Sequence, residues 1–209
     1  MQAIAKFLRT GRISGHNFAA DNRAIAAIEF AMIVPLMLVM FFGTVEFSNA
    51  VAIDRKVTLI ARTLSDLTSQ SAGTVSDSYL QNAFTASIAI VTPYDPTPVE
   101  ATISEIYISA AKVATVQWSK AATISSGATK ATLTASDRNA GDTVTSVIPA
   151  TLLVPQSYII FSEVKYKYTP SVGYVLKGFV TLSDVSYTRP RQVNCVVYNG
   201  TPASSCPTP

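Results

Sequence analysis

The sequence predicts an α+β protein in which a long N-terminal membrane-spanning helix is followed by a small antiparallel sheet domain with packed helices. Three patterns lead to this fold class. The first is a run of sixteen uncharged residues between Glu29 and Glu46. The second is an amphipathic pattern that continues this run, and the third is a series of β-branched and aromatic runs after Ala101.

The uncharged run is long enough to cross most of a membrane. At about 1.5 Å rise per residue it covers about 24 Å of a hydrocarbon core about 30 Å thick, and residues 24–28 complete the span. Pro35 lies inside this helix and removes the hydrogen bond to the carbonyl of Ala31, which predicts a bend or local loosening. An ordinary membrane-helix proline and a functional hinge are both open interpretations.

The helical pattern continues past the apolar run. Apolar residues recur there at spacings of three and four: Val57, Ile60, Ala61, Leu64 and Leu67. This spacing is typical of an amphipathic helix, so one helix is expected over about residues 25–67. We assign residues 25–70 to a transmembrane helix that continues into an amphipathic stalk. A cleaved secretory signal would instead end at a small-x-small site before the mature fold.

The two glutamates that flank the run allow two interpretations. In the first, Glu29 lies at the cytoplasmic interface and Glu46 at the outer one, and water solvates both. In the second, proteolysis creates a free α-ammonium a few residues upstream, and Glu29 pairs with that charge on a neighbouring copy. A charged side chain inside a bilayer needs such a partner because it costs about 2.5 to 3.5 kcal/mol even on lenient scales.

Residues 1–24 form a basic cytoplasmic leader. Its charged residues are Lys6, Arg9, Arg12 and Arg23 against Asp21. Their net charge equals the +3 of the whole chain, so the rest of the chain is neutral. No clustered basic face is visible beyond the leader, and we expect no nucleic-acid partner.

Residues 71–209 are expected to form an extracytoplasmic α+β domain with a tail closed by cysteines. Residues 65–77 are rich in Ser, Thr, Asp and Gly and predict a loop. Ser76 can cap a short helix. One face of that helix would carry Leu80, Ala83, Phe84, Ser87 and Ile88. Prolines at 93, 96 and 98 end the helix.

Four runs predict strands. Thr102–Ile108 and Val113–Trp118 are separated by four residues and predict a hairpin. Tyr158–Tyr168 alternates between apolar and charged residues, which predicts a strand with one buried face, and Phe179–Tyr187 is a further candidate.

Few large apolar residues occur in Ala121–Ala150, so we expect a variable surface excursion there. Trp118 and the tyrosines of the later strands are expected to be core or sheet-surface residues rather than a binding platform.

Cys195 and Cys206 are the only cysteines. With the N-terminus in the cytoplasm they lie outside it, where disulfides persist, and we expect a disulfide rather than a free thiol. Asn199-Gly200-Thr201 matches a glycosylation acceptor, but Asn-Gly also predicts a turn, which we favour.

Catalytic motifs are not visible in the sequence. It has no G-x-S-x-G elbow and no phosphate-cradling glycine loop, and its single histidine, His16, falls in the leader. We expect no enzyme, no cofactor and no metal site, since two thiols do not complete a zinc shell.

The run RAIAAIEFAMIVPL followed by GTVEF resembles the membrane segment of TadE-like minor pseudopilins of tight-adherence (Flp) pilus machines. A weaker likeness to the tail of such proteins recurs at residues 153–191. The resemblance implies cleavage by a prepilin peptidase between Ala24 and Ile25, which makes Glu29 the fifth mature residue. The family more often has glycine where this chain has Ala24.

The resemblance also implies a function. It implies a single-pass protein of the bacterial inner membrane with a periplasmic domain, acting with other pilus subunits and assembly-platform proteins in pilus biogenesis and surface attachment. The alternative is a permanently anchored periplasmic binding or sensor domain with an uncleaved signal anchor. Cleavage between Ala24 and Ile25 distinguishes the two.

Overall fold

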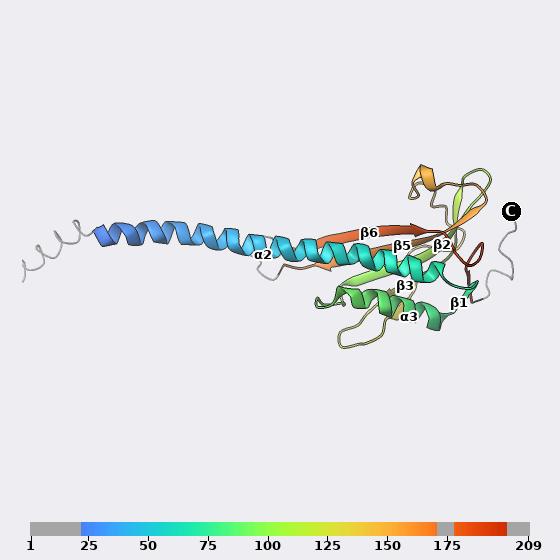
Figure 1. Ribbon diagram of the computed structural model, residues 1–209, viewed down its shortest axis with the longest axis horizontal. Helices are drawn as coiled ribbons and strands as arrows, with labels where there is room; N and C mark the ends of the chain where they lie inside the picture. The colour runs from blue at the N-terminus through green and yellow to red at the C-terminus, as the bar shows by residue number, and fades with distance from the viewer. Residues whose placement is uncertain (1–21, 171–177, 200–209) are drawn as a thin grey trace, which may run out of the picture. The chain divides into compact units, whose positions relative to one another are not determined.

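The computed structural model describes residues 22–170 and 178–199. A helix, α2 (Asn22–Ser69), comes first, followed by β1 (Thr74–Val75), α3 (Asp77–Ile88) and the short helix η1 (Ala89–Val91). The strands β2 (Val99–Ile108), β3 (Ala114–Thr123) and β4 (Thr132–Thr134) follow, and then the short helix η2 (Ala150–Leu152). The described chain ends with β5 (Ser157–Tyr168), β6 (Val180–Thr188) and β7 (Val197–Tyr198) (Figure 1).

The described residues divide into two compact units with their boundary between Phe47 and Ser48. The first unit is the N-terminal part of α2. The second contains the rest of α2 and every other described element. The α+β fold class is therefore confirmed.

A five-stranded sheet organises the second unit. Its order is β4-β3-β2-β5-β6, and each neighbouring pair is antiparallel. The predicted hairpin is β2 with β3, and the alternating strand is β5, with Val164, Tyr166 and Tyr168 buried. A second, two-stranded sheet pairs β1 with β7 in parallel. Because β1 follows α2 directly in the chain, this pairing places the C-terminal strand beside the segment that comes after α2.

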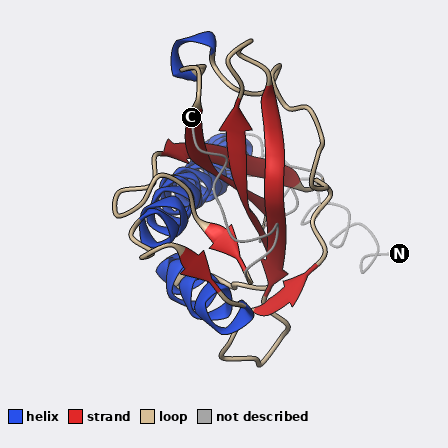
Figure 2. Cartoon of the chain, turned by 90° about the vertical axis from the view of Figure 1, so that its right-hand side faces the viewer, coloured by secondary structure: helices blue, strands red, loops and turns tan. Residues whose placement is uncertain are grey.

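The second half of α2 lies against one face of the sheet (Figure 2), and its apolar stripe belongs to the main core there. The predicted stripe is buried at Val57, Ile60, Ala61 and Leu64. The helix continues to Ser69, so residues 65–69 are helical and not part of the predicted loop. Their hydroxyl groups are satisfied within the fold: Ser65 Oγ lies 2.9 Å from Ser186 Oγ, and Thr68 donates to the Leu64 carbonyl at 2.9 Å.

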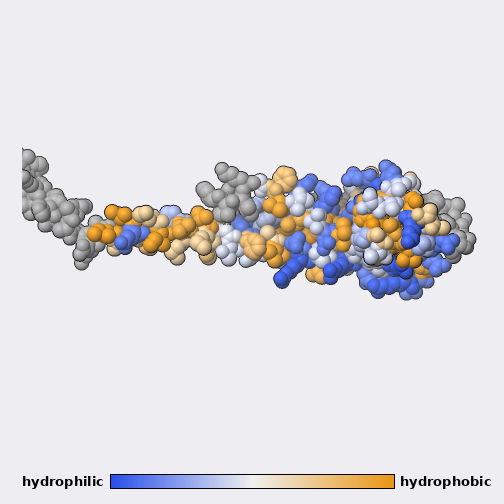
Figure 3. All heavy atoms as spheres, turned by 90° about the horizontal axis from the view of Figure 1, so that it is seen from above, coloured by the Kyte–Doolittle hydropathy of each residue, from blue (hydrophilic) through white to orange (hydrophobic). Residues whose placement is uncertain are grey.

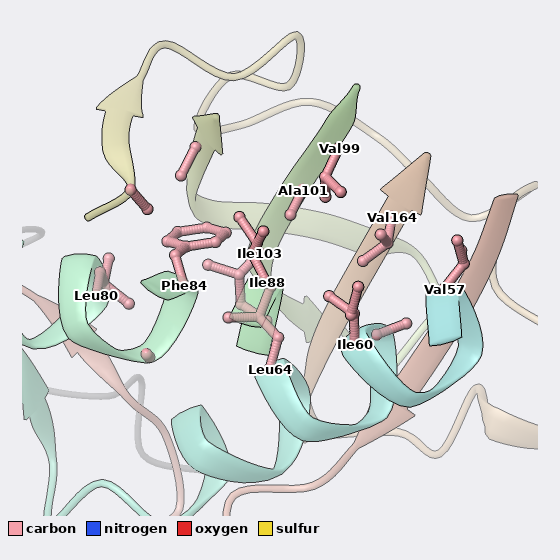
Figure 4. Packing of buried hydrophobic residues seen from close by; sticks show 14 of the residues in the cluster. Val57, Ile60, Leu64, Leu80, Phe84, Ile88, Val99, Ala101, Ile103 and Val164 are labelled. Carbon is pink, nitrogen blue, oxygen red and sulfur yellow. The ribbon is translucent and has the colours of Figure 1, made fainter. Parts of the chain in front are cut away.

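The short helix α3 covers the same face of the sheet. Ser76 caps it, accepting a hydrogen bond from the Tyr79 amide at 3.3 Å. The buried residues of α3 are the five predicted: Leu80, Ala83, Phe84, Ser87 and Ile88. Phe84 and Ile88 lie with Ile103 of β2 between the helices and the sheet (Figure 4).

A β-bulge in β3 divides the apolar side chains between two clusters. Glu105 is paired with Trp118, whereas the next residue, Ile106, is paired with Val116, so Gln117 is the extra residue. Without the bulge Val116 and Trp118 would point to the same face. Instead Trp118 joins the main core under the helices, and Val116 joins a smaller cluster with Ile106.

The expectation that residues 121–150 form a surface excursion holds for most of this segment, whose residues are largely exposed, but parts of it belong to the sheet or are buried. Its first three residues end β3, and β4 pairs with them. Ala131 is buried and is held by α3, because Gln81 donates to its carbonyl at 2.9 Å and its amide donates to Thr85 at 3.0 Å. Val144 and Ile148 are buried in the smaller cluster. A few scattered apolar residues are enough to anchor this segment, because apolar side chains of the sheet form the other side of each buried contact.

Candidate functional site

The first half of α2 presents many large apolar side chains to its surroundings, and apolar residues cover much of the face of this helix seen in Figure 3. Exposed residues of this kind include Ile25, Ile28, Phe30, Met32, Leu36, Met37, Met40, Phe41 and Phe47. A helix of this length and composition meets the requirements for crossing a membrane. Such a continuous apolar surface requires a lipid or protein environment.

Glu29 interrupts that apolar surface. It is exposed, and its neighbours Ile28 and Phe30 are 62% and 69% exposed. None of the three ion pairs among the described residues includes Glu29. In an apolar medium this carboxyl would need a partner from outside the described chain or a position at the headgroups.

The interpretation in which water solvates Glu46 does not agree with the structure. Only 1% of Glu46 is exposed. The two glutamates are therefore not equivalent, because one is buried within the chain and the other is open to a partner.

The other predicted residues of the membrane segment lie on the same helix. Ala24 and Ile25 are helical, and the Ile25 side chain is exposed. Pro35 lies inside α2, whose assignment continues without interruption through it. The bend predicted there stays a prediction.

Cys195 is buried at the start of the C-terminal segment. Cys206 falls outside the described residues, so its pairing with Cys195 stays a prediction. Asn199 has a φ of 45°, which asparagine tolerates in turns, and Gly200 and Thr201 lie outside the described residues.

Sequence reasoning missed Glu105. This carboxyl is 2% exposed and lies under the helices, where it accepts hydrogen bonds from the Val196 amide at 2.5 Å and from Trp118 Nε1 at 3.1 Å. Burial raises the pKa of Glu105 to about 8, against the opposing effect of these two hydrogen bonds. Strict alternation along β2 places Glu105 on the face of Ala101 and Ile103, which was the available signal.

A cleft of about 400 Å³ lies on the other face of the sheet. Arg138 and Glu163 in its wall are already paired, with two contacts of 2.6 Å between the guanidinium and the carboxylate. The hydrogen bonds to Glu163 and the negative charge of that carboxylate raise the pKa of Arg138. Because Arg138 and Glu163 neutralise each other, neither side chain is set up to act as a catalytic acid, base or nucleophile in this cleft.

Comparison with known protein families found a match, which lies in helix α2. The model of the TadE-like protein family matches the chain from residue 24 to residue 64. Residues 24–64 are thus similar to the TadE-like family. The match begins at the predicted processing site and ends in the buried stripe of the stalk, so the TadE-like segment includes Glu29, Pro35 and Glu46. No curated protein and no solved structure matches the chain.

The TadE-like segment indicates a protein associated with Tad pilus systems. Its apolar half is a candidate single-pass membrane anchor. Its second half supplies the core stripe of the α+β unit.

Proposed function

We propose that this protein is a minor pseudopilin-like subunit of a tight-adherence pilus machine. The observation that carries the proposal is the TadE-like match, which covers the apolar helix and extends into the stalk. In this role the protein supports pilus biogenesis and surface attachment. Its contribution is structural rather than catalytic.

The proposed topology follows from the leader and the helix. Residues 1–24 stay in the cytoplasm, the apolar half of α2 crosses the inner membrane, and the sheet unit lies in the periplasm. The four basic residues before the uncharged run favour this orientation only slightly, because Arg55, Lys56 and Arg62 follow that run.

A prepilin peptidase is the first proposed partner. It would cut between Ala24 and Ile25 and give a mature chain whose fifth residue is Glu29. The new α-ammonium of one subunit would then pair with Glu29 of a neighbouring subunit, which is open to such a contact. Other pilus subunits and platform proteins would supply the surroundings that the exposed apolar residues require.

N-terminal mass analysis tests the proposal. In cells that contain the matching peptidase, the membrane form should begin at Ile25, and Ala24→Asp should block its formation, because it puts a charged side chain where the family more often has glycine. The variant Ala31→Asp, which lies after the cut, controls for a general effect of a new charge in the helix. A wild-type membrane form that retains Met1 in that host would favour the alternative of an uncleaved periplasmic binding or sensor domain.

A further inference from the structure

Glu105 is a buried carboxyl on the sheet face that carries the main core. It lies on β2 after Ala101 and Ile103, whose side chains share the main core with the helices. None of the three ion pairs of the described residues includes it. A buried carboxyl without a cation is expensive when ionised, so its contacts and its protonation state decide its effect.

The contacts of Glu105 join the C-terminal segment to the sheet. One carboxyl oxygen accepts from the Val196 amide and the other from the indole of Trp118. The same indole N–H also lies 2.6 Å from the Val196 carbonyl oxygen. Both backbone groups of Val196, which is fully buried, are thus held by two side chains of the sheet.

Among the described residues, backbone hydrogen bonds also join this segment to β1. The Val197 amide donates to the Gly73 carbonyl at 2.8 Å, and the Asn199 amide donates to the Val75 carbonyl at 2.9 Å. These bonds belong to the two-stranded sheet of β1 and β7, which pairs only two residues from each strand. A two-stranded ribbon is marginal by itself, so the contacts of Val196 with Glu105 and Trp118 matter for its attachment.

The titratable neighbours of Glu105 come from each element around it. Tyr107 on β2 and Tyr158 on β5 have ring centroids 4.9 Å apart, and the Tyr158 hydroxyl is buried without a hydrogen-bond partner among the described residues. Burial and the nearby charge of Glu105 raise the pKa of Tyr158 to about 12.

The C-terminal segment and β3 add further groups. Cys195 precedes Val196, and Tyr198 donates its hydroxyl to Asp77 of α3. Lys120 of β3 lies 4.6 Å from the centroid of the Tyr198 ring.

We propose that Glu105 is a pH-responsive latch that holds the segment Cys195–Tyr198 against the sheet. The protonated carboxyl is neutral and fits the buried position. Ionisation places a charge in apolar surroundings, and opening of the segment lets water reach that charge. The latch therefore holds fully below the ordinary carboxyl pKa of about 4.5, weakens as the pH rises from there, and has lost this contribution once the pH passes about 8, the pKa of Glu105 in the closed state.

Trp118 reports directly on this latch, because it is the only tryptophan of the chain and bonds both partners. The full chain in detergent micelles should show a change in tryptophan emission between about pH 6 and about pH 9, with a midpoint near the pKa of Glu105. The protection factors of the Val196 and Val197 amides should fall by up to about a hundredfold between about pH 6 and about pH 8 and then level off, relative to an amide of β5 such as that of Ile160, because linkage changes the opening equilibrium about tenfold per pH unit.

Two variants separate the latch from other titrations. Glu105→Gln keeps the size of the side chain but cannot ionise, so both pH effects should disappear. Glu100→Gln removes an exposed carboxyl of the same strand, which pairs with Lys167, and should leave both effects unchanged. Circular dichroism checks that each variant is folded.

The proposal is overturned if tryptophan emission and amide protection in the wild type stay constant between about pH 6 and about pH 9. It is equally overturned if Glu105→Gln keeps the wild-type pH profile. Should Glu105→Gln fail to fold, the wild-type protection of Val196 against that of Ile160 still decides the question. None of these measurements depends on a pilus role.

Discussion

At the scale of single residues, the glutamates of this chain show how surroundings give one side chain different roles. Glu163 and Glu100 pair with Arg138 and Lys167. Glu105 is buried with two N–H donors, whereas Glu29 is exposed on an apolar helix. The charge of each carboxylate is stabilised by water, by a cation or by hydrogen bonds, and each alternative has a different functional consequence.

The proposed pairing of Glu29 predicts a specific assembly defect. Glu29→Gln keeps the size of the side chain and should spare insertion, since removing a charge favours the bilayer. The unpaired ammonium of the neighbouring subunit should weaken the contact by several kcal/mol, well above the 0 to 1 kcal/mol of a surface pair. The measurements are steady-state level, N-terminal cleavage and co-purification with other pilus subunits.

Glu46→Gln is the matched comparison, because it changes the same group on the same helix. Since Glu46 is buried, we expect this variant to lower the steady-state level rather than act on co-purification alone. If Glu29→Gln behaves like the wild type in all three measurements, Glu29 is only a solvated interface residue.

At the scale of elements, α3 and the second half of α2 depend on the sheet for their stability. Their buried faces meet β2, β3 and β5 in one cluster. Local signals define each helix, but a twelve-residue helix such as α3 is marginal in water by itself. Packing of residues such as Phe84 therefore decides whether α3 remains folded.

Phe84→Ala should lower the free energy of unfolding by about 3 to 5 kcal/mol, because it removes a fully buried ring and leaves a cavity. Urea unfolding followed by circular dichroism measures this change. Leu59→Ala is the control: Leu59 lies on α2 but is 49% exposed, so its loss should change stability by less than about 1 kcal/mol. Equal effects of the two variants would contradict the observed packing.

The C-terminal segment carries a second prediction at this scale. A bond between Cys195 and Cys206 should lower the mass by about 2 Da, and reductant should reverse this loss. Each single Cys→Ser variant should lose at most about 3 kcal/mol of stability and still insert into membranes. Alkylation of both thiols in native, unreduced protein would rule out the bond.

At the scale of the whole molecule, one helix serves two units with different environments. Before Ser48 its large side chains are exposed, and after it the stripe from Ile53 to Leu64 is buried in the core. The hydrophobic effect acts in both parts, but the first part requires surroundings that the described chain does not provide.

A fragment that begins at Ser48 should therefore be soluble and unfold in one cooperative transition, because it keeps the complete core of the second unit. A fragment that begins at Gln70 should aggregate, since it leaves the sheet face uncovered where Val57, Ile60 and Leu64 pack. Size-exclusion chromatography and thermal unfolding compare the two. Folding of the shorter fragment would show that α2 is not needed for the core.

The sequence by itself determined the features that depend on local spacing. The uncharged run predicts the candidate membrane-spanning segment, and spacings of three and four predict the buried stripe of α2. Ser76 and the five residues of α3 were predictable because capping and amphipathicity involve neighbours within a few turns. The family of residues 24–64 was recognisable for the same reason, since its motif is contiguous.

Only the tertiary structure decided the features that depend on distant partners. Glu105 contacts Val196, which lies 91 positions later in the chain. The bulge at Gln117 assigns Val116 and Trp118 to different clusters. Val144 joins the smaller cluster because its amide donates a hydrogen bond to the Ala114 carbonyl of β3. Periodicity records which face of an element a side chain occupies, but the protonation and burial of a group depend on what the fold brings against that face.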